Sequence, residues 1–410
     1  MAQFTLDGVT YSRFQDIPGA VYTRSGVEYQ QNAAGVWAPF DDDVPPRSDG
    51  VGVDVWEGRT NSIRNPTGLG AVAGVIGSGG ALPTNWATAA QTGLTRSVAL
   101  AGPVNGLPTV DIRFNGINSS GSAQQLSIDL ENLTQIAASV GQVWTLPVRL
   151  AVVGGAFPTG ACELWIAERN AGGGLLTTNS LNLKPLVGAS LGLVTSSATL
   201  SQASTAFVQP TLRFSVANGE TYDFTIRIAA PNLKLGANIG DPPILQTTNA
   251  AATRGNPAMY INAPSLLNAP FTVQVWFKSA NVVAASEFRR PFSIDDGTTS
   301  NICDIYLNPG QAVRAFVLTG GVLQADFGTR TFTPGALVKA AVRFKTDSVA
   351  MSVNGLAVES DTSATLAAQY ARIRFGANVE GLPARYLNGA IQRFRILGDT
   401  TDAELQALTA

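Results

Sequence analysis

Apolar and polar residues alternate with a period of two in many segments of this chain. Residues 271–278, FTVQVWFK, place every second side chain from Phe271 to Phe277 on one apolar face. Residues 222–230, YDFTIRIAA, and 389–396, GAIQRFRI, alternate in the same way. Because successive side chains of a strand point to opposite faces, these segments predict half-buried β-strands.

Strand signals recur in two long runs, 95–246 and 258–396, separated by turns rich in Gly and Pro. Each run suits an antiparallel two-sheet sandwich, and the first suits the jelly-roll type. The sequence therefore predicts an all-β fold. Further strands are predicted at 4–6, 22–24, 27–29, 108–114, 127–130, 142–153, 161–168, 191–198, 211–216, 288–294, 302–307, 312–319, 338–344, 348–353 and 372–376.

Two segments interrupt the strand pattern. Residues 41–52, DDDVPPRSDGVG, and 240–257, GDPPILQTTNAAATRGNP, concentrate Pro, Gly and small polar residues, which is typical of loops and linkers. They divide the chain into a β-rich N-terminal region, a first sandwich, a linker and a second sandwich. The predicted bounds are 1–56, 57–245, 246–257 and 258–410.

The C-terminal segment predicts a strand followed by a short helix. Asp402 is the predicted N-cap, and Leu405 and Leu408 are expected to pack against the sandwich. Residues 352–355, SVNG, predict a hairpin, because Asn-Gly suits a type I′ turn, and the return strand is expected at 356–359.

The amino-acid composition excludes several kinds of catalytic and metal-binding site. The 410 residues include no histidine, which excludes Ser-His-Asp and Cys-His catalysis and zinc sites that use histidine. Residues 188–192, GASLG, match the nucleophile-elbow pattern, but Ser190 then has no base to take its proton. A pair of carboxylates is the one catalytic arrangement left open. Cys162 and Cys303 are expected to be buried free thiols in separate domains.

Charge and hydropathy also exclude partners. A formal net charge of −2 gives no electrostatic footprint for nucleic acid. No run of eighteen apolar residues occurs, so membrane insertion is not expected. The N-terminus has no signal-peptide pattern, and we expect a soluble protein that is not exported by a signal of its own.

Several motifs together resemble modular bacteriophage structural proteins. Residues 387–408 and the SVNG hairpin resemble concanavalin-A-like, laminin-G-type domains. Residues 225–257, TIRIAAPNLKLGANIGDPPILQTTNAAATRGNP, and the Asn-Pro stretch that ends at Trp86 are similar to jelly-roll carbohydrate-binding modules of phage tail proteins, with Asn232 and Lys234 replacing the usual Gln and Glu. Residues 23–61 resemble the N-terminal cassette of the same proteins.

The resemblance implies a tail fibre, head spike or head fibre of a phage or a gene transfer agent. Residues 1–56 would then be an attachment region. The implied place is the virion surface, after assembly in the host cytoplasm. The implied partners are other virion proteins, further copies of this chain in a trimer or in the symmetry of the attachment point, and host-surface polysaccharide.

Sugar binding in such sandwiches uses aromatic platforms with nearby planar polar groups. Trp276 is a candidate because it lies on the polar face of its strand, and Trp86 and Trp144 are further candidates; core packing is the alternative for all three. Trp165, between Leu164 and Ile166, is expected to be buried. No cofactor is expected, except that such domains often hold a structural Ca²⁺, for which Asp295, Asp296 and Asp304 are the candidates; solvated turns are the alternative.

Three functions remain open from the sequence. The first is a non-enzymatic virion protein that adheres to host glycan. The second is a purely structural decoration or connector, in which the sandwiches serve as spacers. The third is a polysaccharide depolymerase that uses an acidic pair.

Overall fold

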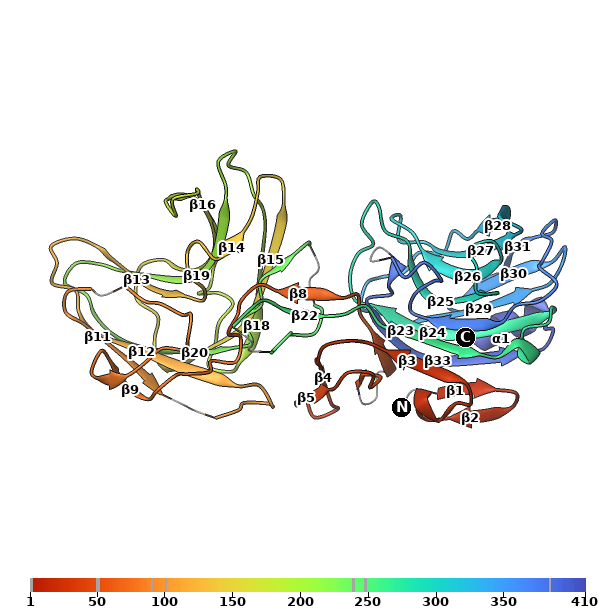
Figure 1. Ribbon diagram of the computed structural model, residues 1–410, viewed down its shortest axis with the longest axis horizontal. Coiled ribbons are helices and arrows are strands. Elements are labelled where there is room, and N and C mark those ends of the chain that lie inside the picture. The colour runs from red at the N-terminus through yellow and green to blue at the C-terminus, as the bar shows by residue number, and fades with distance from the viewer. Residues whose placement is uncertain are drawn as a thin grey trace. The chain divides into compact units, whose positions relative to one another are not determined.

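A computed structural model describes residues 3–48, 52–89, 91–99, 102–237, 240–246, 249–382 and 385–410. The chain forms two compact units, and the predicted all-β fold is confirmed (Figure 1). Met1–Gly58 and Arg254–Ala410 together form the first, here called the terminal unit. Arg59–Thr253 form the second, here called the inserted unit. No helix in the described ranges is both long and apolar enough to cross a membrane.

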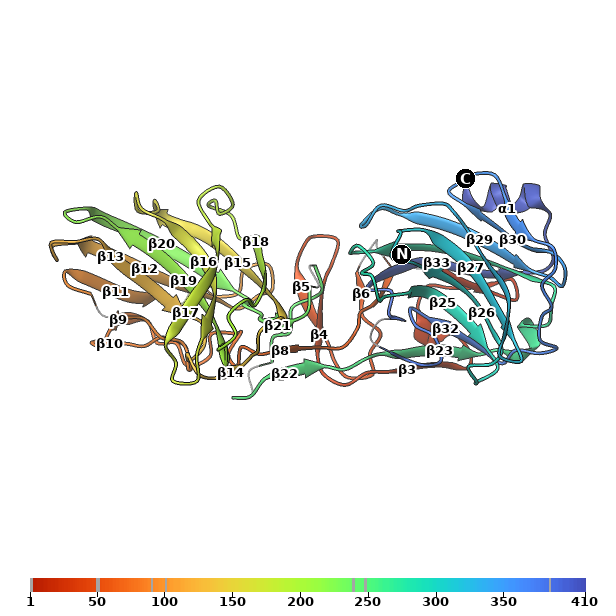
Figure 2. The ribbon, with the colours of Figure 1, turned by 90° about the horizontal axis from the view of Figure 1, so that it is seen from above.

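The inserted unit is a sandwich of two sheets (Figure 2). As far as the chain is described, the larger sheet has the order β10-β9-β11-β12-β20-β15-β18, with β21 beside β15, and the smaller has the order β13-β19-β16-β17, with β14 beside β19. The strands are β9 (Gly74–Ile76), β10 (Gly79–Gly80), β11 (Leu94–Ala99), β12 (Thr109–Ile117), β13 (Gln124–Asp129), β14 (Ile136–Ala137), β15 (Val143–Gly155), β16 (Cys162–Arg169), β17 (Leu175–Asn182), β18 (Gly192–Thr199), β19 (Phe207–Val216), β20 (Thr221–Ala229) and β21 (Lys234–Leu235).

The core of the inserted unit comes from the inward faces of both sheets. Phe224, Ile226 and Ile228 of β20 are buried in it, as the alternation of residues 222–230 predicts. The rings of Phe114, Phe214 and Phe224 contact one another, with centroids 5.1 to 5.8 Å apart. Apolar burial of this kind is the main stabilising contribution in a sandwich.

The terminal unit is a second sandwich. In the described part of the chain one sheet has the order β2-β1-β33-β24-β29-β30-β31, with β7 beside β33 and β6 beside β7, and the other has the order β28-β27-β26-β25-β32-β23-β3. The strands are β1 (Gln3–Leu6), β2 (Val9–Tyr11), β3 (Ala20–Thr23), β6 (Arg47–Ser48), β7 (Gly52–Val55), β23 (Ala258–Asn262), β24 (Phe271–Ser279), β25 (Arg289–Asp295), β26 (Ile302–Leu307), β27 (Val313–Thr319), β28 (Val322–Phe327), β29 (Val338–Phe344), β30 (Val349–Val353), β31 (Glu359–Asp361), β32 (Arg372–Phe375) and β33 (Gly389–Leu397).

The N-terminal segment contributes strands to both sheets of the terminal unit. β1 pairs in parallel with β33, β7 pairs antiparallel with β33, and β3 pairs antiparallel with β23. Phe4 and Phe14, the latter in the short 3-10 turn Phe14–Asp16, are buried against Phe375. The sequence predicts residues 1–56 as a separate region, but strands β1, β2, β3, β6 and β7 of this range belong to the sheets of this sandwich. β4 (Glu28–Gln31) and β5 (Trp37–Phe40) form a hairpin of their own.

The inserted unit begins and ends at neighbouring residues. β8 (Arg59–Asn61) pairs with β22 (Ala252–Arg254), and the hydroxyls of Thr60 and Thr253 are 2.8 Å apart. Within the terminal unit, Gly58 N–H donates to Asn256 Oδ1 at 2.6 Å. The inserted unit is thus an insertion between residues 58 and 254 of the terminal unit.

Helix α1 (Asp402–Thr409) packs on β29 and β30 through Leu405, which contacts Ala341 and Ala350. The predicted N-cap, Asp402, is wrong: the cap is Thr401, whose hydroxyl accepts from Glu404 N–H, while the Glu404 carboxylate accepts from Thr401 N–H at 2.7 Å. Glu at the third helical position completes this capping box, so the cap falls one residue earlier. Asp402 instead pairs with Arg343 at 2.9 Å.

The Asn354-Gly355 turn has positive φ at both residues, 50° and 72°, as a type I′ turn requires. The return strand β31 begins at Glu359, not at residue 356. A second 3-10 turn is formed by Pro264–Leu266.

Candidate functional site

The outward face of the smaller sheet of the inserted unit carries an aromatic ring among polar side chains. On β16, Leu164 and Ile166 point into the core, so Glu163 and Trp165 point outward. Trp165 is half-buried, so the prediction of a buried Trp165 is wrong. The same alternation that buries Leu164 and Ile166 contains this signal, because neighbours on a strand face opposite sides. Figure 2 shows β16 beside β17 and β19.

Two side chains hold the Trp165 ring in place. Its indole N–H donates to Glu163 Oε2 at 2.8 Å, and the guanidinium carbon of Arg213 lies 4.6 Å from the ring centroid. Both contacts fix the orientation of the ring before any ligand arrives. Ser180, directly opposite on β17, is small and exposed, so it leaves space beside the ring.

A pocket of about 380 Å³ adjoins this ring through Glu163. It is lined by Thr159, Gly160, Ala161, Glu163, Asn182 and Lys184. Lys184 Nζ donates to the carbonyl of Thr159 at 2.8 Å, and Lys184 N–H donates to Asn182 Oδ1 at 3.1 Å. These contacts order the ammonium and the amide while leaving further hydrogen-bonding capacity on each.

Glu220 supports the pocket from behind. Its carboxylate accepts from Thr159 N–H at 2.7 Å and from Ala217 N–H at 2.8 Å. Burial acts to raise the pKa of Glu220, but these N–H donors outweigh it and hold the pKa below its ordinary value. The carboxylate is therefore charged at neutral pH and anchors the loop that carries Thr159.

The rest of this face is polar. Asp129 accepts from the hydroxyl of Thr211 at 2.9 Å, and burial raises the pKa of Asp129 despite this hydrogen bond. Burial lowers the pKa of Arg213, and its buried Nε–H has no hydrogen-bond partner among the described residues. An oriented indole beside carboxylate, ammonium, amide and hydroxyl groups can bind a polyhydroxylated ligand. The C–H groups of such a ligand pack on the indole, and its hydroxyls form hydrogen bonds with the polar groups.

The structure places Trp86 and Trp144 in the core of the same unit. They are 7% and 4% exposed. Trp86 donates to the carbonyl of Asn65 and Trp144 to Gln142 Oε1, both at 3.1 Å. Their geometry is that of packing side chains with a satisfied indole N–H, and a ligand-binding role for them stays a prediction.

Trp276 lies on the outward face of β24 in the terminal unit. Arg393 of β33 and Lys339 of β29, on the strands to either side, place their cations 4.0 and 4.9 Å from its ring centroid. Two cations therefore lie over this ring, whereas one, Arg213, lies over the ring of Trp165. A platform role for Trp276 stays a prediction.

The three predicted calcium ligands have other partners. Asp295 accepts from Arg374 and Asp304 from Arg290, both at 2.5 Å, and both carboxylates are fully buried. Asp296 accepts from Thr298 and Asn301 within its own turn. Among the residues that the structure describes, no three Asp, Glu or Cys side chains gather as a metal site would require. Calcium binding by these three aspartates stays a prediction.

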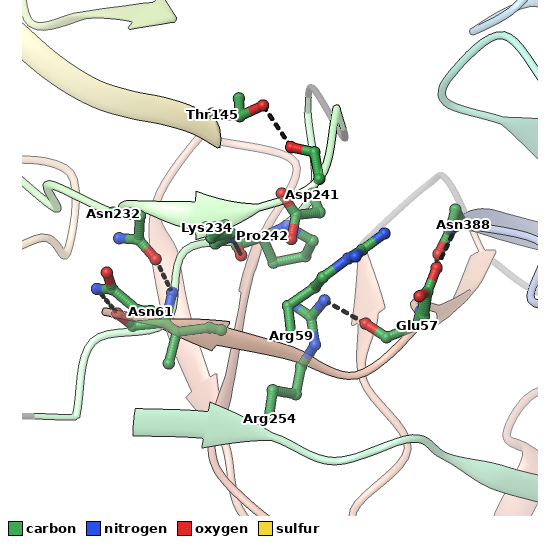
Figure 3. Close-up of polar contacts among 12 residues, drawn as sticks. Glu57, Arg59, Asn61, Thr145, Asn232, Lys234, Asp241, Pro242, Arg254 and Asn388 are labelled. Atoms are coloured by element: carbon green, nitrogen blue, oxygen red, sulfur yellow. Dashed lines mark hydrogen bonds and ion pairs between the residues drawn. The ribbon is translucent and has the colours of Figure 1, made fainter. Parts of the chain in front are cut away.

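The motifs that carry the phage resemblance meet in polar clusters (Figure 3). In the inserted unit, Asn61 donates to the carbonyls of Pro231 and Ile244, and Asn232 Oδ1 accepts from Ile244 N–H. Beside them, Lys234 Nζ lies 2.8 Å from Asp241 Oδ2, with both side chains almost fully buried. Segments 60–63, 230–236 and 241–244 are thereby tied together.

A matching cluster lies in the terminal unit. Arg254, fully buried, donates to the carbonyl of Glu57 at 2.9 Å, and Glu57 N–H donates to Asn388 Oδ1 at 2.8 Å (Figure 3). Arg254 also lies 3.7 Å from Glu28, which Arg24 approaches equally closely. These motif residues are buried, and they hold the ends of each unit together.

Residues 253–404 match the family model of the Concanavalin A-like lectin/glucanases superfamily. The predicted concanavalin-A-like character of the C-terminal sandwich is therefore confirmed. No curated protein sequence matches the chain.

Some solved structures are distantly similar. One is the CBM40 domain of the Ruminococcus gnavus IT-sialidase bound to alpha2,6 sialyllactose, with 17% identity, 36% of this chain and 86% of that chain covered, and a TM-score of 0.30. Another is the tripod from the baseplate of bacteriophage Tuc2009, with 12% identity, 77% and 100% coverage, and a TM-score of 0.29. A third is the CBM22 tandem of Paenibacillus barcinonensis Xyn10C, with 8% identity, 81% and 99% coverage, and a TM-score of 0.24. At these TM-scores the likenesses say nothing about the function of this chain.

Proposed function

We propose that this chain is a non-enzymatic carbohydrate-binding protein of the surface of a phage or phage-like particle, where it attaches the particle to host glycan. The observation that carries the proposal is the outward indole of Trp165, fixed by Glu163 and Arg213 beside a polar pocket. The family match of residues 253–404 and the ordered phage-like motifs support it.

The virion role rests on the resemblance of the motifs alone. A tail fibre, a head spike and a head fibre share it equally. The absence of histidine, and a site built of groups that donate and accept hydrogen bonds around a ring, support binding without turnover. A purely structural connector is the alternative, and it predicts a chain that binds no glycan.

The test is the full chain on an array of bacterial surface polysaccharides, with size-exclusion of each ligand after incubation. We expect retention on at least one glycan with no loss of polymer length. Trp165→Ala should weaken that binding at least about tenfold, because aromatic anchors contribute about 2 kcal/mol or more at binding sites.

Trp276→Ala tests the other predicted platform; because two cations lie over that ring, it should weaken binding less than Trp165→Ala does. Silence on every glycan and on host envelopes would favour the connector. Shortened polymer would instead mean a depolymerase.

A further inference from the structure

We infer that the pocket beside Trp165 is built for an uncharged hexose and discriminates against acidic sugars. The inference rests on the proposed function and adds the class of ligand to it. It follows from the charges that line the pocket and from the hydrogen bonds that these groups have already made.

The charges within the pocket balance. Glu163 supplies one carboxylate and Lys184 one ammonium, and no other charged side chain lines it. Neither makes an ion pair with the other or with another described residue; Glu163 accepts from the Trp165 indole and Lys184 donates to a backbone carbonyl. Each charge therefore faces the pocket with a neutral partner behind it.

Further charges nearby do not favour an anion. Glu220 lies directly behind the Thr159 backbone, close enough to Lys184 for attraction between them to help lower the pKa of Glu220. A sugar carboxylate that approached Lys184 would also approach Glu163 and Glu220. Arg213 lies over the ring, where Asp129 and Glu163 attract its guanidinium and Arg169 repels it. Three carboxylates, of Glu163, Glu220 and Asp129, thus oppose the three cations of Lys184, Arg213 and Arg169, so a sugar carboxylate gains no net attraction.

The remaining hydrogen-bonding capacity suits a pair of neighbouring hydroxyls. Glu163 Oε1 has no donor among the described residues, while Lys184 Nζ retains two N–H groups and the Asn182 amide retains its donors. One hydroxyl of a pyranose can donate to Glu163, and its neighbour can accept from Lys184 or Asn182. The Trp165 indole lies next to these groups and is joined to Glu163 by its N–H. Such a site rejects ligands that leave its polar groups unpaired.

The experiment measures binding of the full chain to neutral polymers (dextran, mannan, galactan) and to acidic ones (polygalacturonate, polysialic acid) at 50 and 500 mM NaCl. We expect binding to at least one neutral polymer, with less than about a twofold change between the two salt concentrations, because no net charge is neutralised. Acidic polymers should bind at least about tenfold more weakly.

Two variants test the residues. Glu163→Gln and Lys184→Met should each weaken neutral binding about tenfold, while Lys345→Met, on an exposed surface of the terminal unit, should not. Thermal unfolding checks that each variant is folded. Exclusive binding of acidic polymers, or neutral binding that neither variant weakens, would overturn the inference and leave the proposed function standing. No binding to any polymer would overturn the proposed function itself.

Discussion

At the scale of single residues, the inserted unit depends on charges buried in pairs. Lys234 stands where the resembling modules carry Glu, and the structure explains how this chain tolerates the change. Its ammonium meets Asp241 at 2.8 Å and donates to the carbonyl of Pro242 at 3.1 Å. A buried charge is tolerated only with such partners, because its desolvation costs several kcal/mol.

Removing one partner of this pair should be severe. Lys234→Met leaves Asp241 buried beside an apolar chain, and we expect the free energy of unfolding of the inserted unit to fall by about 3–5 kcal/mol. Urea unfolding followed by circular dichroism measures it. The control is Arg113→Met in the same unit, which breaks an exposed pair with Asp223 and should lower the free energy of unfolding far less, because solvent screens that pair. Equal losses in the two variants would contradict this account.

The two thiols should be inert in the folded protein. Both are buried, as predicted, one in each unit. Burial raises the pKa of Cys162 to about 11 and raises the pKa of Cys303 strongly, so both stay protonated at pH 8, where the thiolate is the reactive form. A colorimetric thiol reagent at pH 8 should therefore detect neither cysteine in the native chain and both in urea. Rapid reaction of the native chain would contradict the burial.

At the scale of elements, the sequence predicts faces better than it predicts ends. The alternation in residues 271–278 assigns Phe271, Val273 and Phe277 to the core, and all are buried. The predicted start of helix α1 is wrong by one residue, because Thr401 and Asp402 are both residue types that favour an N-cap. Thr401 is the cap because Glu404, three residues later, accepts from its N–H.

The cap makes a measurable contribution. Thr401→Ala should lower the free energy of unfolding of the terminal unit by about 1 kcal/mol, and Leu405→Ala by about 2–5 kcal/mol through the lost packing on Ala341 and Ala350. Thr362→Ala, in an exposed bend, is the control. Thr401 N–H and hydroxyl hold the pKa of Glu404 below its ordinary 4.5. The stabilisation that the ionised Glu404 adds to the cap is therefore complete above pH 4.5 and is lost as the pH falls through the lowered pKa. The loss of unfolding free energy caused by Thr401→Ala should be smaller at pH 3 than at pH 7, and an equal loss at both would contradict this account.

The candidate site illustrates what the sequence leaves undecided. Alternation is enough to turn Trp165 outward, but whether an outward ring is covered depends on the neighbouring strands. Trp165 has Ser180 opposite it on one side and a single cation, Arg213, over its ring, whereas Trp276 has the cations Arg393 and Lys339 on its two sides. Strand order and register bring these neighbours together, and both join residues far apart in the chain. The pocket groups of Lys184 and Thr159 meet for the same reason.

At the scale of the whole molecule, the notable feature is the split terminal unit. Strand signals give the two sandwiches, yet nothing in the local pattern shows that β1 pairs with β33, nearly the length of the chain away. The sequence therefore predicts the N-terminal strands to form a separate region. Pairing partners over such a distance follow from the completed core, to which Phe4, Phe14 and Val55 all belong.

Fragments should behave unequally as a result. We expect residues 59–253 alone to fold, because their ends meet at Thr60 and Thr253 and their core is complete. Residues 254–410 alone should be insoluble or molten, because the core residues that β1, β3 and β7 cover would be exposed to solvent. Co-expression with residues 1–58 should restore a soluble, folded terminal unit. Solubility and amide-exchange protection measure this; a well-folded 254–410 fragment would contradict it.

The split of the terminal unit also determines how the protein responds to mechanical force. Both chain ends belong to the terminal unit, where β1 and β33 lie side by side and parallel. Tension between the two ends would load these strands in shear, along their length, so that their hydrogen bonds resist together. The inserted unit is connected to the terminal unit at two adjacent points. It would therefore carry no tension until β1 and β33 separated.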